Sequence, residues 1–305
     1  PELPHLEESG MGSVSGERDG MGVEGVPIGA VKRHRIYGVD FSAAADAGKN
    51  IWIASATVEE WSLRIEDCRR AENLKGSGRD LNRCLAALRN FIEREGECAF
   101  GFDFPFGLPS SLVNTDSWEE FVLSFPQRYS SPEEFRKSCL SDAGGSELRR
   151  VTDAESQTPF SPYNLRLYRQ TYFGIRDLLG PLLRNQLVCV LPMQRPLPGK
   201  PWLLEVCPAS TLKRRGVYSP YKGRNEKHHV ARTHILESLE EMSSLSIPTA
   251  LRRDVIGDHH GDAIDSIIAA FTTFRALLNP AGLAVTSNVY KIEGYVYSPA
   301  KSASF

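Results

Sequence analysis

Several common catalytic signatures are absent from this sequence of 305 residues. It contains no G-x-x-x-x-G-K-[ST] loop, no H-E-x-x-H pair and no G-x-S-x-G turn. A P-loop enzyme, a zinc protease and a serine hydrolase are therefore disfavoured. No run of 18 apolar residues occurs, so we expect no membrane-spanning helix and no membrane partner. The net charge is only −2, so any surface for nucleic acid must be a local one.

The six cysteines are scattered singly, and none forms a C-x-x-C pair. This spacing favours reduced, buried thiols over a disulfide framework or a zinc site, and it predicts a cytoplasmic protein. Residues 1–34 are rich in glycine, glutamate and serine and contribute no apolar core. We therefore expect a disordered leader over residues 1–34, followed by a single domain over residues 35–300.

Apolar patterning in the first part of that domain predicts a mixed α/β sheet. Three strand patterns with short connections suggest antiparallel neighbours, and a pattern of helical spacing then leads to a fourth strand. A helical crossover brings this fourth strand back parallel to the first, which gives a β-β-β-α-β order. The strands are predicted over residues 36–41, 51–58, 61–66 and 98–105.

The remainder of the chain predicts mainly helices around one further strand. A mostly helical insertion is expected at about 110–185, with a loop over residues 141–161. Residues 202–208 form an apolar strand that carries an acid and closes with proline, and a strong helix begins at Asp262. Residues 289–297 predict a final strand or hairpin.

Five acidic residues stand out because their sequence neighbours are apolar. Four of them have an ordinary explanation when taken alone: a turn cap for Asp40, a strand-edge salt bridge for Glu205, and helix capping for the pair Asp262 and Asp265. Taken together they form a pattern, because three strands each carry one acid towards an end and a late helix presents two on one face. The five are Asp40, Asp103, Glu205, Asp262 and Asp265.

Clusters of carboxylates without softer ligands suit Mg²⁺ or Mn²⁺. Two such ions can activate a water and stabilise a leaving oxygen during phosphodiester cleavage. The sequence therefore predicts that these five acids bind metal and are catalytic, with water as the nucleophile. His259 and His260 adjoin the helical pair, and either a role near the metals or a hydrogen bond at the helix entry fits them.

Two basic segments with interspersed aromatic residues are the predicted substrate-binding surface. A predicted helix over residues 162–183 carries several arginines on one side, and residues 213–232 hold seven cations against one acid. Arginine and lysine contact phosphates, and tyrosine stacks on exposed bases. A solvated face over a core of aromatic residues is the alternative for both segments. The residues predicted to bind substrate are Arg169, Tyr172, Arg176, Lys213 and Lys222.

Four short motifs in this order resemble the DUF429 family, a branch of predicted ribonuclease H-like nucleases. They begin at Gly38 (GVDFS), Phe102 (FDFPFGLP), Glu205 (EVCPA) and His260 (HGDAIDS), and the resemblance spans about residues 36–297. It implies a ribonuclease H-like mixed sheet flanked by helices. It also implies that Asp40, Asp103, Glu205 and either Asp262 or Asp265 bind metal.

The leading hypothesis is a nuclease-like phosphodiester hydrolase that depends on Mg²⁺ or Mn²⁺ and acts on RNA or DNA. An actin- or sugar-kinase-like phosphotransferase is a second hypothesis, because that group shares the core topology. It would need a duplicated β-β-β-α-β half and a glycine-rich nucleotide site, for which Gly144 and Gly145 are a poor substitute. A non-catalytic nucleic-acid-binding protein that keeps the fold is the third.

Overall fold

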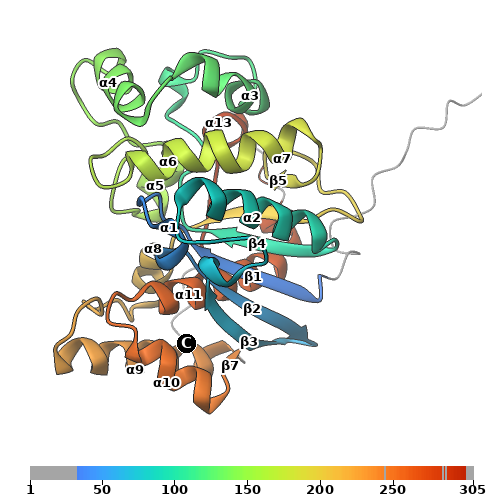
Figure 1. The fold of residues 1–305 in the computed structure, drawn as a ribbon, viewed down its shortest axis with the longest axis vertical. Coiled ribbons are helices and arrows are strands. Elements are labelled where there is room, and N and C mark those ends of the chain that lie inside the picture. The colour runs from blue at the N-terminus through green and yellow to red at the C-terminus, as the bar shows by residue number, and fades with distance from the viewer. Residues whose placement is uncertain (1–32, 244, 284, 286, 300–305) are drawn as a thin grey trace, which may run out of the picture.

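A computed structural model describes residues 33–299 except 244, 284 and 286 (Figure 1). The predicted leader concerns residues 1–34, of which residues 1–32 lie outside the described residues. The centre of the fold is a mixed sheet with the strand order β5-β6-β4-β1-β2-β3-β7. The short strand β8 pairs with the last two residues of β6, after the residues that pair with β5. The strands are β1 (Arg35–Asp40), β2 (Trp52–Glu59), β3 (Ser62–Arg70), β4 (Cys98–Phe102), β5 (Cys189–Leu191), β6 (Trp202–Val206), β7 (Leu245–Ser246) and β8 (Val296–Tyr297).

The strand directions confirm the predicted ribonuclease H-like topology. Strands β1, β2 and β3 are antiparallel neighbours, whereas β4 lies parallel to β1 and β6 lies parallel to β4. The crossover from β3 to β4 is the helix α2 (Leu81–Arg94), which the side chain of Asp80 caps. The carboxyl ends of β1, β4 and β6 therefore meet at one edge of the sheet.

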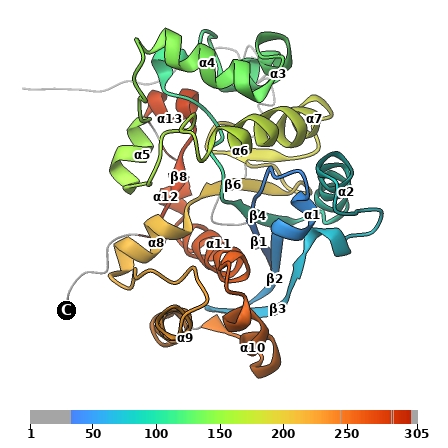
Figure 2. The ribbon, with the colours of Figure 1, turned by 60° about the vertical axis from the view of Figure 1, so that its left-hand side comes forward.

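Helices cover both faces of the sheet (Figures 1 and 2). One buried cluster lies between the sheet and a layer that includes α2, α3, α6 and α7, and a second lies between the sheet and α8 to α11. The helices other than α2 are α1 (Ala47–Asn50), η2 (Ala71–Asn73), η3 (Ser110–Leu112), α3 (Trp118–Arg128), α4 (Pro132–Asp142), α5 (Val151–Ser156), α6 (Tyr168–Phe173), the π-helical η4 (Gly174–Leu179), α7 (Gly180–Arg184), α8 (Pro208–Arg215), α9 (Glu226–Ser243), α10 (Thr249–Gly257), α11 (Asp262–Leu277), α12 (Pro280–Leu283) and α13 (Asn288–Glu293).

Two glycines set the distance between α11 and the sheet. Gly38 of β1 and Gly101 of β4 are partners in register. A Cβ atom on Gly38 would lie 2.0 Å from the backbone oxygen of Ser266, and one on Gly101 would lie 2.0 Å from Oγ1 of Thr273. No larger residue fits at either position, because the helix backbone packs directly on the strands.

Three local predictions differ from the structure. The expected loop over residues 141–161 contains α5, and the expected final strand over residues 289–297 is mostly the helix α13, with only β8 as a strand. The helix expected to begin at residue 162 begins at Tyr168. Figure 2 shows α5 beside α13 and β8, so both short helices are held by contacts between segments distant in sequence. Local patterning does not contain that information.

None of the helices in the described part of the chain is long and apolar enough to cross a membrane. All six cysteines are free thiols. That residues 35–300 act as one domain, with the helices between β4 and β5 as an insertion, stays a prediction.

Candidate active site

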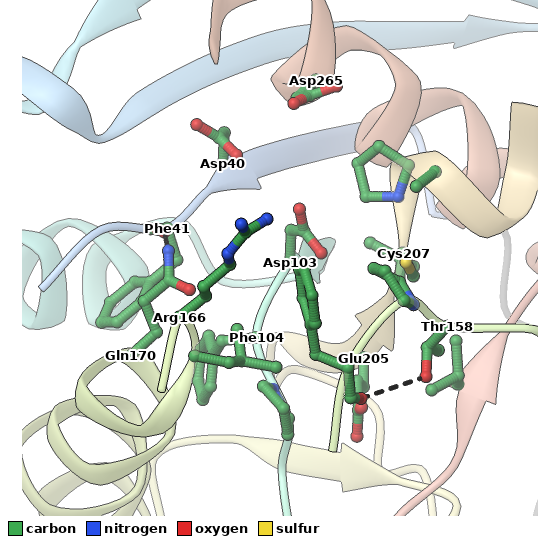
Figure 3. Close-up of a pocket in the computed structure, with 18 of the residues that line it drawn as sticks. Asp40, Phe41, Asp103, Phe104, Thr158, Arg166, Gln170, Glu205, Cys207 and Asp265 are labelled. Atoms are coloured by element: carbon green, nitrogen blue, oxygen red, sulfur yellow. Dashed lines mark hydrogen bonds between the residues drawn. The ribbon is translucent and has the colours of Figure 1, made fainter. Parts of the chain in front are cut away.

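A pocket of about 580 Å³ opens where β1, β4 and β6 end and α11 begins. All five predicted acids line it, and Figure 3 labels Asp40, Asp103, Glu205 and Asp265. Figure 3 shows Asp103 between Asp40 and Glu205, with Asp265 on the same side of the pocket as Asp40. The pocket thus gathers side chains that lie more than 200 residues apart in the sequence, as the pattern of acidic strand ends predicts.

The register of β1 and β4 places Asp40 and Asp103 on the same face of the sheet. Val39 pairs with Phe102, and the backbone N–H of Asp103 donates to the oxygen of Val39 at 3.0 Å, which extends the pairing by one residue. Residues level with one another on adjacent strands point to the same side. Burial, and next the charge of Asp265, raise the pKa of Asp103 to about 8 and raise the pKa of Asp40 well above its ordinary value.

The first turn of α11 leaves both of its aspartates available to the pocket. Oδ2 of Asp258 accepts from the backbone N–H groups of Asp262 and Ala263 at 2.8 and 3.0 Å. Because Asp258 caps the helix, the capping role considered for Asp262 and Asp265 is already filled. Gly261 precedes the helix with a left-handed φ of 80°, a conformation that favours glycine.

Lys222 is the counter-charge of these two aspartates. Its Nζ lies 2.7 Å from Oδ2 of Asp265 and 3.6 Å from Oδ1 of Asp262. The hydroxyl of Tyr221 donates to Oδ1 of Asp265 at 2.5 Å. Burial alone would lower the pKa of Lys222, but Asp265 and Asp40 raise it overall, so the ammonium stays charged. Lys222 was predicted to bind substrate, and the structure places it in the pocket.

Glu205 also lines the pocket, but protein donors already bind its carboxylate. It is level with Phe102 rather than with Asp103, so its side chain leaves the opposite face of the sheet from Asp40 and Asp103. There Nη1 of Arg150 donates to Oε2 at 2.8 Å, Nη2 donates to Oε1, and the backbone N–H of Phe106 also donates to Oε2. Both oxygens of Glu205 are therefore engaged by donors of the protein.

Arg150 forms the centre of a buried ion network. Its Nε and Nη2 donate to the carboxylate of Asp153 at 2.9 and 2.8 Å, and Arg150, Asp153 and Glu205 are each at most 2% exposed. Nη1 also donates to the backbone oxygen of Glu293 at 3.2 Å. The guanidinium thus ties α5 and α13 to β6 through the carboxylate of Glu205. That Glu205 binds metal stays a prediction.

The predicted substrate-binding residues divide into two groups. Lys213 and Lys222 line the pocket, whereas the three from α6 and η4 do not. Arg169 pairs with Glu133, and Arg176 pairs with Asp177 next to it. Tyr172 is fully buried in the core, so its ring cannot stack on a base.

Arg166 and Gln170 are pocket residues that the sequence analysis did not single out. Arg166 points into the pocket in Figure 3, and the Gln170 amide donates to the backbone oxygen of Phe41. They lie four residues apart around the start of α6, on a side of the helix different from that of Arg169. Arg166 lies in a turn before α6, in which Oδ1 of Asn164 accepts from the backbone N–H of Arg166. The prediction of a helix from residue 162 did not include this turn.

The donor set of the pocket suits Mg²⁺ or Mn²⁺, although the side chains do not enclose such an ion as they stand. Among the described residues, no group of three or more His, Cys, Asp or Glu side chains converges to hold a metal ion. The donors that face the pocket are carboxylate oxygens, which are the ligands of hard cations. Burial raises the pKa of the Cys207 thiol, which also lines the pocket, to about 12.

Comparison with known proteins adds one distant likeness. No family model matches the chain, and no curated protein matches it. The crystal structure of the yeast mitochondrial Holliday junction resolvase Ydc2 aligns with 84% of this chain and 87% of its own, at 12% sequence identity and a TM-score of 0.37.

Proposed function

We propose that this protein is a divalent-metal-dependent, nuclease-like phosphodiester hydrolase that acts on nucleic acid. The observation that supports it is the meeting of Asp40, Asp103, Asp262 and Asp265 in one pocket at the ends of β1 and β4 and the start of α11. Holding buried carboxylates close together costs stability, as the raised pKa values of Asp40 and Asp103 indicate. A divalent cation offsets that repulsion. We also propose, from the motif resemblance, that the chain belongs with the DUF429 proteins.

In this proposal Asp40, Asp103 and Asp265 hold the ion, with Asp262 at its edge. When bound, Mg²⁺ or Mn²⁺ would supply an activated water and stabilise charge on the phosphoryl oxygens. Lys222 holds Asp265 and Asp262 in place before the ion arrives. Arg166 and Lys213, both exposed at the pocket, bind the phosphates of the substrate.

The test is cleavage of an RNA, DNA and branched-DNA panel with Mg²⁺, Mn²⁺ or EDTA. We expect cleavage with either metal and none in EDTA. Asp40→Asn should lower the rate at least about 100-fold, because one of the ligands of the ion is lost. Asp46→Asn is the matched control, since Asp46 lies six residues away and its side chain is 54% exposed. Equal cleavage by the two variants would refute the assignment of Asp40.

Two other functions give different results in the same assay. A phosphotransferase would transfer phosphate from a nucleotide without cleaving the panel. The described part of the chain contains a single β-β-β-α-β unit in its sheet, which does not favour the duplicated kinase-like architecture. A non-catalytic protein would bind nucleic acid and leave it intact with either metal. The cytoplasmic location stays a prediction.

A further inference from the structure

We infer that the pocket takes unpaired, single-stranded nucleic acid rather than a duplex. This inference rests on the proposed function and deepens it by naming the substrate class. Three features carry it: the burial of the carboxylates, the size of the pocket, and two pairs of a cation with an aromatic ring at its rim.

Two of the carboxylates in the pocket are buried. Asp265 is 2% exposed and Asp40 is 9% exposed. A phosphate reaches them only if the strand that carries it enters the pocket. A sphere of the volume of the pocket, about 580 Å³, would be about 10 Å across. A DNA duplex is wider than this, because its major groove alone is about 12 Å wide, so a duplex does not fit inside the pocket. A volume of this size suits a nucleotide-sized group.

The rim of the pocket is built to bind such a strand. The guanidinium of Arg166 lies 5.5 Å from the ring centre of Phe160, and Nζ of Lys213 lies 5.7 Å from the ring centre of Tyr218. All four residues line the pocket, and Tyr218 is 49% exposed. Each pair places a cation for a phosphate over one face of a ring, and a base would stack on the opposite face. Cations combined with stacking rings bind single strands without a fixed sequence.

The two pairs lie on one continuous rim. Lys213 donates through Nζ to the backbone oxygen of Gln157 at 3.0 Å, and Arg214 donates to the oxygen of Glu155 at 2.8 Å. These bonds join α8 to α5 and to Gln157, which follows α5. A strand can therefore pass over both rings before its phosphate turns down to Asp40 and Asp265, on a path that base pairing would block.

The experiment is fluorescence anisotropy in EDTA, where no metal is present to support cleavage. The probes are a 12-nucleotide single strand, a blunt duplex of the same sequence, the duplex with an unpaired tail, a four-way junction, and a dinucleotide. We expect the single strand and the tailed duplex to bind at least 10-fold more tightly than the blunt duplex or the junction. Equal binding of the blunt duplex, or a dinucleotide that binds as tightly as the 12-mer, would overturn the inference.

Substitutions at the rim test the rings separately. Phe160→Ala and Tyr218→Leu should each raise the Kd for the single strand by about 5- to 150-fold, the range expected for one stacked base. Tyr218→Phe keeps the ring and should change the Kd less than about 2-fold. Trp61→Ala removes an aromatic side chain that is 75% exposed on the β2–β3 turn and should also have no effect. If Trp61→Ala weakens binding as much as the rim variants do, the rim is not the binding surface.

The two proposals fail in different ways. Preferential binding of the single strand with no cleavage under Mg²⁺ or Mn²⁺ would refute the hydrolase and leave the substrate class standing. Metal-dependent cleavage at equal rates in the blunt duplex and the single strand would refute the substrate class and leave the hydrolase standing.

Discussion

Asp103→Asn should stabilise the metal-free protein, and increasingly so as the pH rises. In the folded state the pKa of Asp103 is raised from 3.8 to about 8, first by burial and then by the charge of Asp265. A folded-state pKa above the unfolded value means that the folded protein binds the proton more tightly. The stability from that proton is present at low pH and is lost as the pH rises towards 8. Asparagine has no proton to lose, so the variant escapes this loss.

The magnitude follows from the size of the shift. Each pH unit between the two pKa values changes the free energy of unfolding by about 1.4 kcal/mol, so the step from pH 5 to pH 8 amounts to at most about 4 kcal/mol. Rearrangement of the pocket and entry of water make the real change smaller than this maximum. We expect the difference in the free energy of unfolding between Asp103→Asn and the unchanged protein to increase by about 2–4 kcal/mol from pH 5 to pH 8.

The assay is urea unfolding at pH 5 and pH 8 in EDTA, followed by circular dichroism. Asp116→Asn, which removes an exposed carboxylate outside the pocket, controls for the loss of one negative charge. The reasoning is refuted if the difference between Asp103→Asn and the unchanged protein is the same at both pH values, or shrinks as the pH rises.

Three further substitutions test other parts of the site. Gly38→Ala should destabilise the fold by about 3 kcal/mol or more in urea unfolding, because its Cβ would meet the backbone of α11. Gly257→Ala, which has open space around it, should be neutral or stabilising, and a similar loss there would contradict the packing argument. Arg150→Met should lower the free energy of unfolding by about 3–5 kcal/mol, since two buried carboxylates lose their partner. A decrease of less than about 1 kcal/mol would show that the ion network is dispensable for stability. Lys222→Met should lower the Tm in EDTA, and Mn²⁺ should raise it more than in the unchanged protein, because the ion then replaces a missing counter-charge; equal shifts would count against a metal beside Asp265.

The core of the fold could be predicted from the sequence because its strands are continuous apolar segments with clear breaks. The short helices α5 and α13 could not, since segments that lie far away in the sequence hold them in place. Asp40 and Asp103 each follow a glycine by two residues, in Gly38-Val39-Asp40 and Gly101-Phe102-Asp103. That shared spacing indicates the same face of the sheet.

The surroundings of Glu205 could not be predicted for the same reason. In the register of β4 and β6, Glu205 is level with Phe102, and Val206 occupies the position that corresponds to Asp103. The position of an acid near a strand end does not show which face it leaves from, because a shift of one residue reverses the side to which a side chain points. Arg150 could not have been found from its neighbours in sequence, since its partner Glu205 lies 55 residues away.

The glycine pair under α11 acts as a fixed spacer. At Gly38 the backbone of Ser266 packs directly on β1, and at Gly101 the Thr273 side chain and the backbone oxygen of Ala269 pack on β4, so neither position has room for a Cβ atom. Asp40 and Asp103 follow these glycines by two residues. The close packing at the glycines therefore also sets how near the two acids lie to the first turn of α11. Two Gly-x-Asp strands followed by a late helix that begins with two aspartates thus form a sequence pattern with a geometric meaning. That pattern can identify distant relatives even where overall identity is too low to align them.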